Sequence, residues 1–484
     1  MINEKYEILI YFSDQHSPQV AGYMGDPFVC TPNLDRIAAR GMSFDNAYTA
    51  CPLCVPARAA FMTGRIPSKL NVFNNNSDFK SSDLSFAHML ALNGYETNLI
   101  GRMHFIGLDH YHGFTRRLGT DLTSSYWGTP TDKRADAGEF GRSFYQKFCL
   151  EVIGAGDSPV LEYDRSIVDE AVEFYSKDYD KAQMTVVGTY GPHFPYVCHP
   201  ELVDKYKNIL RGHCNDARET FDIPILNTKV QWADDEDLLS LRAAYYAMVE
   251  LMDEQIGRVY EAFRASLRRS GRKGVFIYMS DHGDQIGYKG LYGKQTFFER
   301  SAAIPLLVEI DGFEGGRRIE ESCSIMDIGP TLIELSDSEP LPYADGRSFL
   351  NLLRGEREPG RSAVAEFYDR MDGKTIVGRM LHRDGMKLIS YQGYEDKDML
   401  FDLASDPEET RNVAKDYKSC YNELKEILRS HTVSEDKSAE YEAAFATHAV
   451  LERIGLMQTG WNCFTHAIPD GLNVVPEEWK RARR

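Results

Sequence analysis

Two short apolar runs, far apart in the chain, restrict the fold more than any other feature of the sequence. Residues 8–12 and 274–279 are almost wholly apolar, and each run is followed by a polar segment that contains an aspartate, Asp14 or Asp281. A continuous apolar run of this length is typical of a strand buried on both faces of a parallel sheet. Because ligands bind at the carboxyl ends of strands in open α/β sheets, we expect both aspartates at one functional edge.

Strand-like and helix-like segments alternate between these two runs. Residues 97–100 and 184–188 have strand character, and polar residues follow both. The alternation predicts an α/β fold in which helices sandwich a mostly parallel central sheet. Proline near the start, glycine at the end and apolar residues at helical spacing mark the expected helices. These helices cover residues 31–41, 83–93 and 238–263.

The pattern of the sequence changes at about residue 350. Short strand-like segments separated by turns follow, and a closing helix is expected near residues 417–428. The expected strands cover residues 379–382, 386–390 and 399–403. We therefore expect a large α/β domain over 1–350, a smaller C-terminal α+β subdomain with an antiparallel sheet over 351–431, and a tail over 432–484. The tail ends in a basic cluster, for which we expect solvation or a contact in a homo-oligomer.

Composition excludes several classes of partner. The sequence has 55 Lys and Arg against 73 Asp and Glu, a formal net charge of −18, so we expect no binding to nucleic acid or to anionic membranes. No apolar stretch approaches the roughly 20 residues of a membrane-spanning helix. An anionic substrate would therefore need a local basic site.

The first residues and the cysteines indicate the compartment. The chain runs from Met1 into the first strand without the features of a signal peptide, so we expect no secretion by that route. Nine cysteines, an odd number, are scattered through the chain and do not resemble a disulfide framework. We therefore expect a cytoplasmic protein.

Cys54 opens the most specific motif of the chain. Pro56 and Arg58 follow it in the pattern Cys-x-Pro-x-Arg, and Thr-Gly-Arg follows at 63–65. Pro56 is suited to the first position of a helix, which would leave the sulfur of Cys54 at a helix N-terminus, where backbone N–H groups attract anions. With Cys51 the residue also forms a Cys-x-x-Cys pair, so a redox pair or half of a zinc site is an alternative.

This string resembles the signature of type I sulfatases, a family of the alkaline phosphatase superfamily. The resemblance implies that a separate formylglycine-generating maturation enzyme oxidises Cys54 to formylglycine, whose hydrated aldehyde is the nucleophile. It also implies a sulfuric-ester hydrolase that acts on a small anionic sulfate ester or a sulfated sugar through a covalent sulfated intermediate. The similarity covers most of the chain, from Asp14 to residues 400–403 and 406–409, which resemble the small C-terminal domain of the family.

Within the family, the chain is most similar to the choline-sulfatase and phosphonate-monoester-hydrolase branch. Many arylsulfatases have Asp-Asp after the first strand and Asp-Asn after the later one, whereas this chain has Asp14-Gln15 and Asp281-His282. The segments that carry the similarity to the branch are 51–54, 73–75, 101–105 and 112–114.

The resemblance also implies a divalent metal ion. Its ligands would be Asp14, Gln15, the modified Cys54, Asp281 and His282. An imidazole ligand softens an otherwise oxygen-rich site, so manganese or zinc compete with the calcium or magnesium that oxygen ligands favour.

The remaining site residues are also implied by the resemblance. Arg58 would hold the diol, and Lys294 would neutralise charge on the transferring group. His193 would be the general acid for the leaving alcohol, and His104 the base that expels sulfate, since histidine titrates near neutrality. The implied substrate-binding residues are Asn75 and Arg102, the latter standing where the family commonly has lysine.

Two rival functions remain open at this stage. One is a phosphonate monoester or phosphodiester hydrolase with the same nucleophile, favoured by the Asp14-Gln15 and Asp281-His282 pairs. The other is a binding protein in which Cys54 is never modified. A choline substrate would need an aromatic or acidic cradle, for which Tyr126, Trp127 and Glu366 are candidates.

Overall fold

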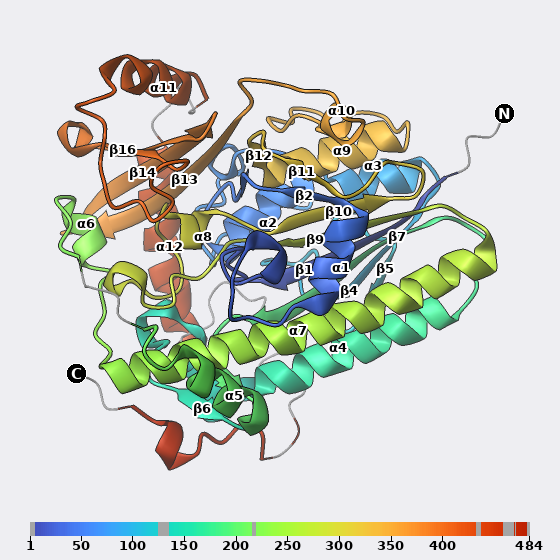
Figure 1. Cartoon of the computed structure of the whole chain (residues 1–484), viewed down its shortest axis with the longest axis horizontal. Helices are drawn as coiled ribbons and strands as arrows, with labels where there is room; N and C mark the ends of the chain where they lie inside the picture. The colour runs from blue at the N-terminus through green and yellow to red at the C-terminus, as the bar shows by residue number, and fades with distance from the viewer. Residues whose placement is uncertain are drawn as a thin grey trace.

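A computed structural model describes residues 5–123, 135–214, 219–431, 437–457, 469 and 471–481. Its centre is an eight-stranded sheet in the order β11-β2-β10-β9-β1-β7-β4-β5 (Figure 1). Five pairs of neighbouring strands are parallel, namely β1/β7, β1/β9, β4/β7, β4/β5 and β2/β11. In this sheet only β10 runs antiparallel to its neighbours, β2 and β9. In sheet order, the strands are β11 (Arg317–Ile319), β2 (Met42–Phe44), β10 (Leu306–Ile310), β9 (Gly274–Ser280), β1 (Glu7–Asp14), β7 (Gln183–Pro192), β4 (Glu96–Gly101) and β5 (Arg116–Leu118).

Strand β1 lies in the middle of this sheet, which explains its continuous apolar sequence. All of its residues are buried, because side chains that alternate along a strand meet a hydrophobic core on each face. Leu9 and Tyr11 belong to one core, whereas Ile8, Ile10 and Phe12 belong to the other. The predicted mostly parallel sheet between helices is therefore confirmed.

Helices cover both faces of the central sheet (Figure 1). The long helices α4 and α7 run side by side across one face, together with α1 and α5, and the shorter α2, α3, α9 and α10 lie on the opposite face. On the first face these are α1 (Pro32–Arg40), α4 (Pro159–Ser176), α5 (Pro200–Leu210) and α7 (Asp235–Ser270). On the second they are α2 (Cys54–Thr63), α3 (Phe86–Leu92), α9 (Ile328–Leu335) and α10 (Leu350–Leu353).

Two of the expected helices differ from the prediction at their ends. Helix α3 begins at Phe86 and not at residue 83, because the Ser85 N–H donates to Nδ1 of His88 (3.1 Å) and so stops the helix at its N-terminus. The long helix α7 extends beyond the expected 238–263 at both ends, from an N-cap at Asp234 to a left-handed Gly271. The predicted helix over 31–41 is present as α1.

A second sheet of four antiparallel strands lies beside the central one (Figure 1). It contains the three strands expected after residue 350 and one strand, β13, that the sequence did not reveal. Its strands are β13 (Ser362–Met371), β14 (Lys374–Arg383), β15 (Met386–Tyr391) and β16 (Met399–Asp402), and α11 (Lys418–His431) packs on it. The boundaries proposed at 350 and 431 stay predictions.

The predicted tail contains a helix. Helix α12 (Ser438–Met457) packs on the small sheet through Tyr441, whose ring joins a cluster with Phe73 and Tyr368. Part of the segment over 432–484 therefore packs on the small sheet. None of the helices that the structure describes is long and apolar enough to cross a membrane.

The chain also contains shorter strands and helices. Two pairs of short strands form separate two-stranded sheets. They are β12 (Cys323–Ser324) with β3 (Ala47–Tyr48), and β6 (Ile153–Ala155) with β8 (Tyr196–Cys198), and two single-turn helices are α6 (Pro224–Asn227) and α8 (Glu299–Ala302).

Candidate active site

The tips of two neighbouring strands bring the predicted acidic residues together. Asp14 is the last residue of β1, and Asp281 and His282 follow directly after β9. The two strands are parallel and in register up to the pair Ser13 and Ser280, so both tips end at the same edge of the sheet. All three side chains are fully buried.

Cys54 reaches the same edge from helix α2. The prediction that the helix begins at Pro56 is wrong by two residues, because α2 begins at Cys54 itself and Pro56 is its third residue. Proline is tolerated there, since the first N–H groups of a helix have no partner within it. The sulfur of Cys54 therefore does lie at a helix N-terminus, as expected. Arg58 lies one turn further along the same helix.

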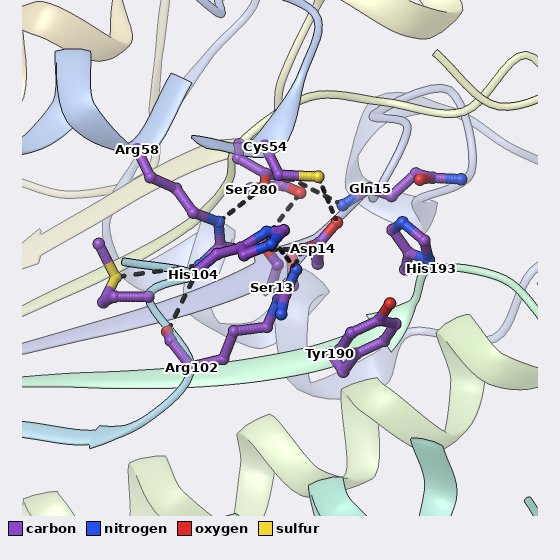
Figure 2. A network of polar contacts seen from close by, with 12 residues as sticks. Ser13, Asp14, Gln15, Cys54, Arg58, Arg102, His104, Tyr190, His193 and Ser280 are labelled. Carbon is purple, nitrogen blue, oxygen red and sulfur yellow. Dashed lines mark hydrogen bonds and ion pairs between the residues drawn. The ribbon is translucent and has the colours of Figure 1, made fainter. Parts of the chain in front are cut away.

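The side chains of Asp14, Cys54, Asp281 and His282 form a compact cluster, seen in part in Figure 2. One donor atom from each lies within 4.8 Å of the others. Sγ of Cys54 is 3.3 Å from Nε2 of His282 and 3.8 Å from Oδ1 of Asp14, and Nε2 of His282 is 3.6 Å from Oδ1 of Asp281. An oxygen in place of this sulfur would lie among the same donor atoms.

The surrounding hydrogen bonds orient the cluster toward its centre. His282 donates Nδ1–H to the carbonyl oxygen of Gly283 (3.1 Å), which leaves the Nε2 lone pair to face the cluster. Arg58 binds the outer carboxylate oxygens, with Nε 2.9 Å from Oδ2 of Asp281 and Nη2 3.1 Å from Oδ2 of Asp14. Two carboxylates, one imidazole and the atom at position 54 make a donor set that fits a divalent cation.

Charge and burial act differently on Asp14 and Cys54. Burial alone would raise the pKa of Asp14, but the guanidinium groups of Arg102 and Arg58 outweigh it and hold that pKa well below its usual value. Burial raises the pKa of the Cys54 thiol to about 11, and the nearby Asp14 carboxylate acts in the same direction. The carboxylate is therefore ionised and suited to a cation, whereas the unmodified thiol is protonated and a poor nucleophile.

Gln15, Lys294 and His193 form a second group beside the cluster. Figure 2 shows Gln15 and His193 to the right of Asp14. Nζ of Lys294 donates to Oε1 of Gln15 (2.6 Å) and lies 2.5 Å from Nε2 of His193. His193 donates Nδ1–H to the carbonyl oxygen of Phe194 (2.7 Å), so its Nε2 accepts from the lysine. Burial and the Lys294 charge hold the pKa of His193 well below its usual value. The ligand role of Gln15 stays a prediction.

Arg102 and His104 lie on the other side of Asp14 in the same view. Nε of Arg102 donates to Oδ2 of Asp14 (2.9 Å), and Nη2 lies 2.7 Å from Nδ1 of His104. Nη1 donates to Oδ1 of Asp121 and to Oγ1 of Thr123, both at 2.6 Å. Each nitrogen of the guanidinium group thus has a protein partner. A contact of Arg102 with substrate stays a prediction.

Asn75 lies at the N-terminus of helix α2. Its Oδ1 accepts from the backbone N–H of Val55 (3.0 Å), so the side-chain amide caps the helix that begins at Cys54. This bond fixes which end of the amide faces the helix and turns its NH₂ group the other way. A substrate contact by Asn75 stays a prediction.

Two acidic residues at the site were missed by sequence reasoning. Asp121 follows β5, a strand of three residues that is too short to recognise from its sequence. Asp284 stands three residues after Asp281, and its Oδ2 accepts from Nε2 of Gln15 (2.5 Å) and from the Tyr196 hydroxyl (2.9 Å). Asp284 lies in the polar segment that follows β9, and this position was the sequence signal that could have identified it.

The choline cradle stays a prediction. Tyr126 and Trp127 lie outside the residues that the structure describes. Glu366 is buried in β13, where Oε1 accepts from the backbone N–H of Ser68 (2.7 Å). Cys51 is buried and forms no disulfide with Cys54.

Comparison with known proteins agrees with this geometry. The sequence model of the Sulfatase family matches residues 7–338, and a model described as the C-terminal part of N-sulphoglucosamine sulphohydrolase matches residues 287–435. The choline-sulfatase of Rhizobium meliloti (strain 1021) is 32% identical over 442 residues, which cover 86% of this chain and 83% of that protein. An arylsulfatase of Clostridium perfringens (strain 13 / Type A) is 26% identical over 465 residues, which cover 88% and 94%.

The fold also has solved relatives. The crystal structure of a phosphonate monoester hydrolase of Agrobacterium radiobacter superposes with a TM-score of 0.70 at 21% identity, covering 92% of this chain and 96% of that chain. At this identity the likeness shows a common fold. Together with the match over residues 7–338 and the 32% identical relative, it leads to one conclusion. The chain belongs to the sulfatase family and is a sulfatase.

Proposed function

We propose that this sulfatase hydrolyses a small sulfate ester or a sulfated sugar, with formylglycine formed from Cys54 and one divalent metal ion. The observation that carries the proposal is the position of Cys54, whose sulfur lies at the start of a buried helix within 3.8 Å of Asp14 and His282. The nucleophile and the candidate metal ligands therefore share one centre.

The metal and the modified residue would supply the chemistry that the unmodified side chains lack. A bound divalent ion would supply positive charge for the oxygens of the sulfuryl group, and formylglycine would supply an attacking hydroxyl in place of a protonated thiol. Asp14, Gln15, Asp281 and His282 would hold the ion. The imidazole in this set makes manganese or zinc competitive with calcium or magnesium.

The side chains around this centre have complementary tasks. Arg58 binds both Asp14 and Asp281, and so fixes the two carboxylates against each other. Nζ of Lys294 lies 2.5 Å from Nε2 of His193 and can donate a hydrogen bond to it, so the pair would be the source of the proton for the departing alcohol. The Lys294 charge and the NH₂ group of Asn75 would bind the anionic end of the substrate.

The experiment that tests the proposal compares matched esters. We expect purified protein to hydrolyse nitrophenyl sulfate with a kcat/KM at least about 10²-fold above that for phenyl phosphonate esters, a difference of about 3 kcal/mol in barrier. Mass spectrometry of the Cys54 peptide should show formylglycine in active protein. High specific activity with only unmodified cysteine would refute the nucleophile.

A phosphonate monoester hydrolase is the second candidate, favoured by the fold relative and by the Asp14-Gln15 and Asp281-His282 pairs. A reversed preference in the same assay would support it. A third possibility, an unmodified binding protein, would show no turnover of either ester. A panel of sulfate esters with and without a quaternary ammonium would then test choline sulfate, the substrate named for the 32% identical relative.

Several broader expectations stay predictions. The eight cysteines that the structure describes form no disulfide, which supports the proposed cytoplasmic location. Dependence on a separate maturation enzyme follows from the proposed modification. A homo-oligomeric state is a proposal that size-exclusion chromatography with light scattering would test.

A further inference from the structure

The side-chain amide of Gln15 lies between a group that accepts hydrogen bonds and a group that donates them. Its Nε2 donates to Oδ2 of Asp284 at 2.5 Å, and its Oε1 accepts from Nζ of Lys294 at 2.6 Å. A carboxylate has no hydrogen to give and an ammonium group has no lone pair, so only one of the two amide orientations satisfies both neighbours. All three side chains are buried. Figure 2 shows Gln15 on the same side of Asp14 as His193.

We infer that Asp284 is a positioning residue that turns Oε1 of Gln15 toward Lys294 and the candidate metal centre. An amide binds a metal ion through its oxygen, and this oxygen keeps a second lone pair after it accepts from the lysine. The reversed amide would present an NH₂ group, which cannot bind a cation. Metal binding by this oxygen rests on the proposed function, whereas the orientation of the amide does not.

Four described donors bind the Asp284 carboxylate. Oδ2 also accepts from the Tyr196 hydroxyl at 2.9 Å, and Oδ1 accepts from the backbone N–H groups of Ile286 and Gly293, both at 2.9 Å. Each oxygen therefore accepts two hydrogen bonds, which suits an ionised carboxylate. A donor in the place of either oxygen would lose its partners.

The backbone of Gln15 is held in place independently of the amide. Its N–H donates to Oδ1 of Asp281 at 3.0 Å, and its carbonyl oxygen accepts from the Tyr245 hydroxyl at 2.8 Å. Its φ of +68° is a left-handed conformation that is uncommon outside glycine and needs such support. Rotation of the amide group is therefore the way in which its oxygen and nitrogen can exchange places.

The backbone of Lys294 is held by a second glutamine. Oε1 of Gln146 accepts from the N–H of Lys294 at 3.1 Å, and Nε2 of Gln146 donates to the carbonyl oxygen of Lys294 at 2.8 Å. Gly293, the preceding residue, donates its N–H to Asp284. Asp284 thus binds the Gln15 amide and also the turn that carries the lysine opposite it.

Two substitutions that exchange an oxygen for an NH₂ group test this orientation. In Asp284→Asn, the new NH₂ group faces the NH₂ group of Gln15, and a reversed Gln15 amide would instead face the Lys294 ammonium group. Gln15→Glu places two carboxylates against each other. In the double variant, the amide at position 284 donates to the carboxylate at position 15, which still accepts from the lysine, so each contact again joins a donor to an acceptor.

Urea unfolding of the metal-free, full-length protein measures this coupling. Each single variant should lower the urea midpoint, because each leaves a buried polar contact mismatched. The double variant should unfold at a higher urea concentration than either single variant. A role of Asp284 that did not involve the Gln15 amide would give no such recovery.

Gln15→Glu combined with Asp327→Asn is the matched control. Asp327 is a buried carboxylate that accepts from Nη2 of Arg361 (2.9 Å) and from the backbone N–H groups of Ser324 and Arg347, with no partner at the active site among its described contacts. This pair should show the sum of its two separate losses.

Titration calorimetry with Mn²⁺ measures the consequence for the metal. Asp284→Asn should bind Mn²⁺ about 10–100-fold more weakly than the wild type, which is the usual effect of losing a residue that orients a metal ligand. The double variant presents a carboxylate oxygen in place of the amide oxygen and should recover affinity.

A double variant that unfolds no later than the single variants, or that fails to fold, overturns the inference. Unchanged Mn²⁺ affinity in Asp284→Asn, or a wild type that binds no Mn²⁺, overturns the role toward the metal. Absence of sulfate-ester hydrolysis would refute the proposed function, whereas the urea midpoints would still decide the orientation of the amide, so the two failures are distinguishable.

Discussion

At the residue scale, the Lys294 and His193 pair is the proposed source of the proton for the departing alcohol. A proton donor matters most when the departing alcohol is a poor leaving group. His193→Ala should therefore slow alkyl sulfates by about 10²–10⁴-fold and nitrophenyl sulfate by less than about 10-fold. Steady-state kcat/KM values for both ester types check this. Equal slowing of the two would exclude His193 as the group that protonates the alcohol.

The metal centre gives a second prediction at this scale. Asp281→Asn removes a negative charge from the buried cluster and His282→Ala removes a donor atom, so both should lower metal content below one ion per chain and abolish turnover. Elemental analysis of purified variants measures the metal directly, and removal of the ion from wild-type protein by a chelator should have the same effect on rate. Asp327→Asn, a buried carboxylate elsewhere, is the control. Full metal content in both site variants would refute the assigned ligands.

At the element scale, the N-terminus of α1 depends on a carboxylate from another helix. Asp253 of α7 accepts from the backbone N–H groups of Asn33 and Leu34 at 3.1 and 2.8 Å. Burial raises the pKa of Asp253 to about 6, above its unfolded value. A raised pKa in the folded state stabilises the fold most at low pH, and this contribution is lost as the pH rises through about 6.

The raised pKa of Asp253 predicts that the difference in stability between the wild type and Asp253→Asn depends on pH. The stability advantage of the wild type over Asp253→Asn should shrink by roughly 2–3 kcal/mol as the pH rises from about 4 to about 6. Urea unfolding at several pH values measures it. Asp178→Asn, at a side chain that is 86% exposed, should show no such change. A constant advantage over this range would contradict the raised pKa.

Helix α12 reaches the active-site loop through an aromatic cluster. The ring centres of Phe73 and Tyr441 are 5.7 Å apart, and those of Phe73 and Tyr368 are 4.9 Å apart. Phe73 stands two residues before Asn75, which caps the helix that carries Cys54. Tyr441→Ala should therefore release the loop and lower kcat/KM by about 3–10-fold, the equivalent of about 1 kcal/mol of aromatic contact. Phe445→Ala, a half-exposed ring on the same helix, should have little effect; equal losses in both variants would contradict the link.

At the scale of the whole molecule, one buried lysine joins the small sheet to the catalytic unit. Nζ of Lys387 in β15 lies 2.8 Å from Oε1 of Glu299 in α8 and 2.7 Å from Oε1 of Glu409 in the loop after β16. Lys387 is fully buried, so its loss would leave two carboxylates without a cation. Lys387→Met should lower the free energy of unfolding by about 3–5 kcal/mol.

Denaturant unfolding measures this loss. Adding Glu299→Gln and Glu409→Gln to Lys387→Met should recover part of the stability, because the uncompensated charges are then gone. Lys177→Met removes an exposed lysine from a helical pair with Glu173 and should cost less than about 1 kcal/mol. A similar cost for both lysine variants would mean that the buried bridge does not hold the sheets together.

The sequence by itself determined the features that depend on neighbouring residues. The apolar runs before Asp14 and Asp281 identified two central strands, because a strand buried on both faces needs apolar side chains at every position. The proline and glycine at the ends of α1 marked its limits in the same way. The string that begins at Cys54 indicated the family, since its residues are adjacent in sequence.

Only the tertiary structure decided the features that depend on distant contacts. Strand β13 has a weak signal of its own and forms where the rest of the chain supplies a surface for it. Asp121 follows a strand too short to predict, yet it bonds both Arg102 and His104. Such contacts form only when strands that are distant in sequence, such as β4 and β7, are placed in register.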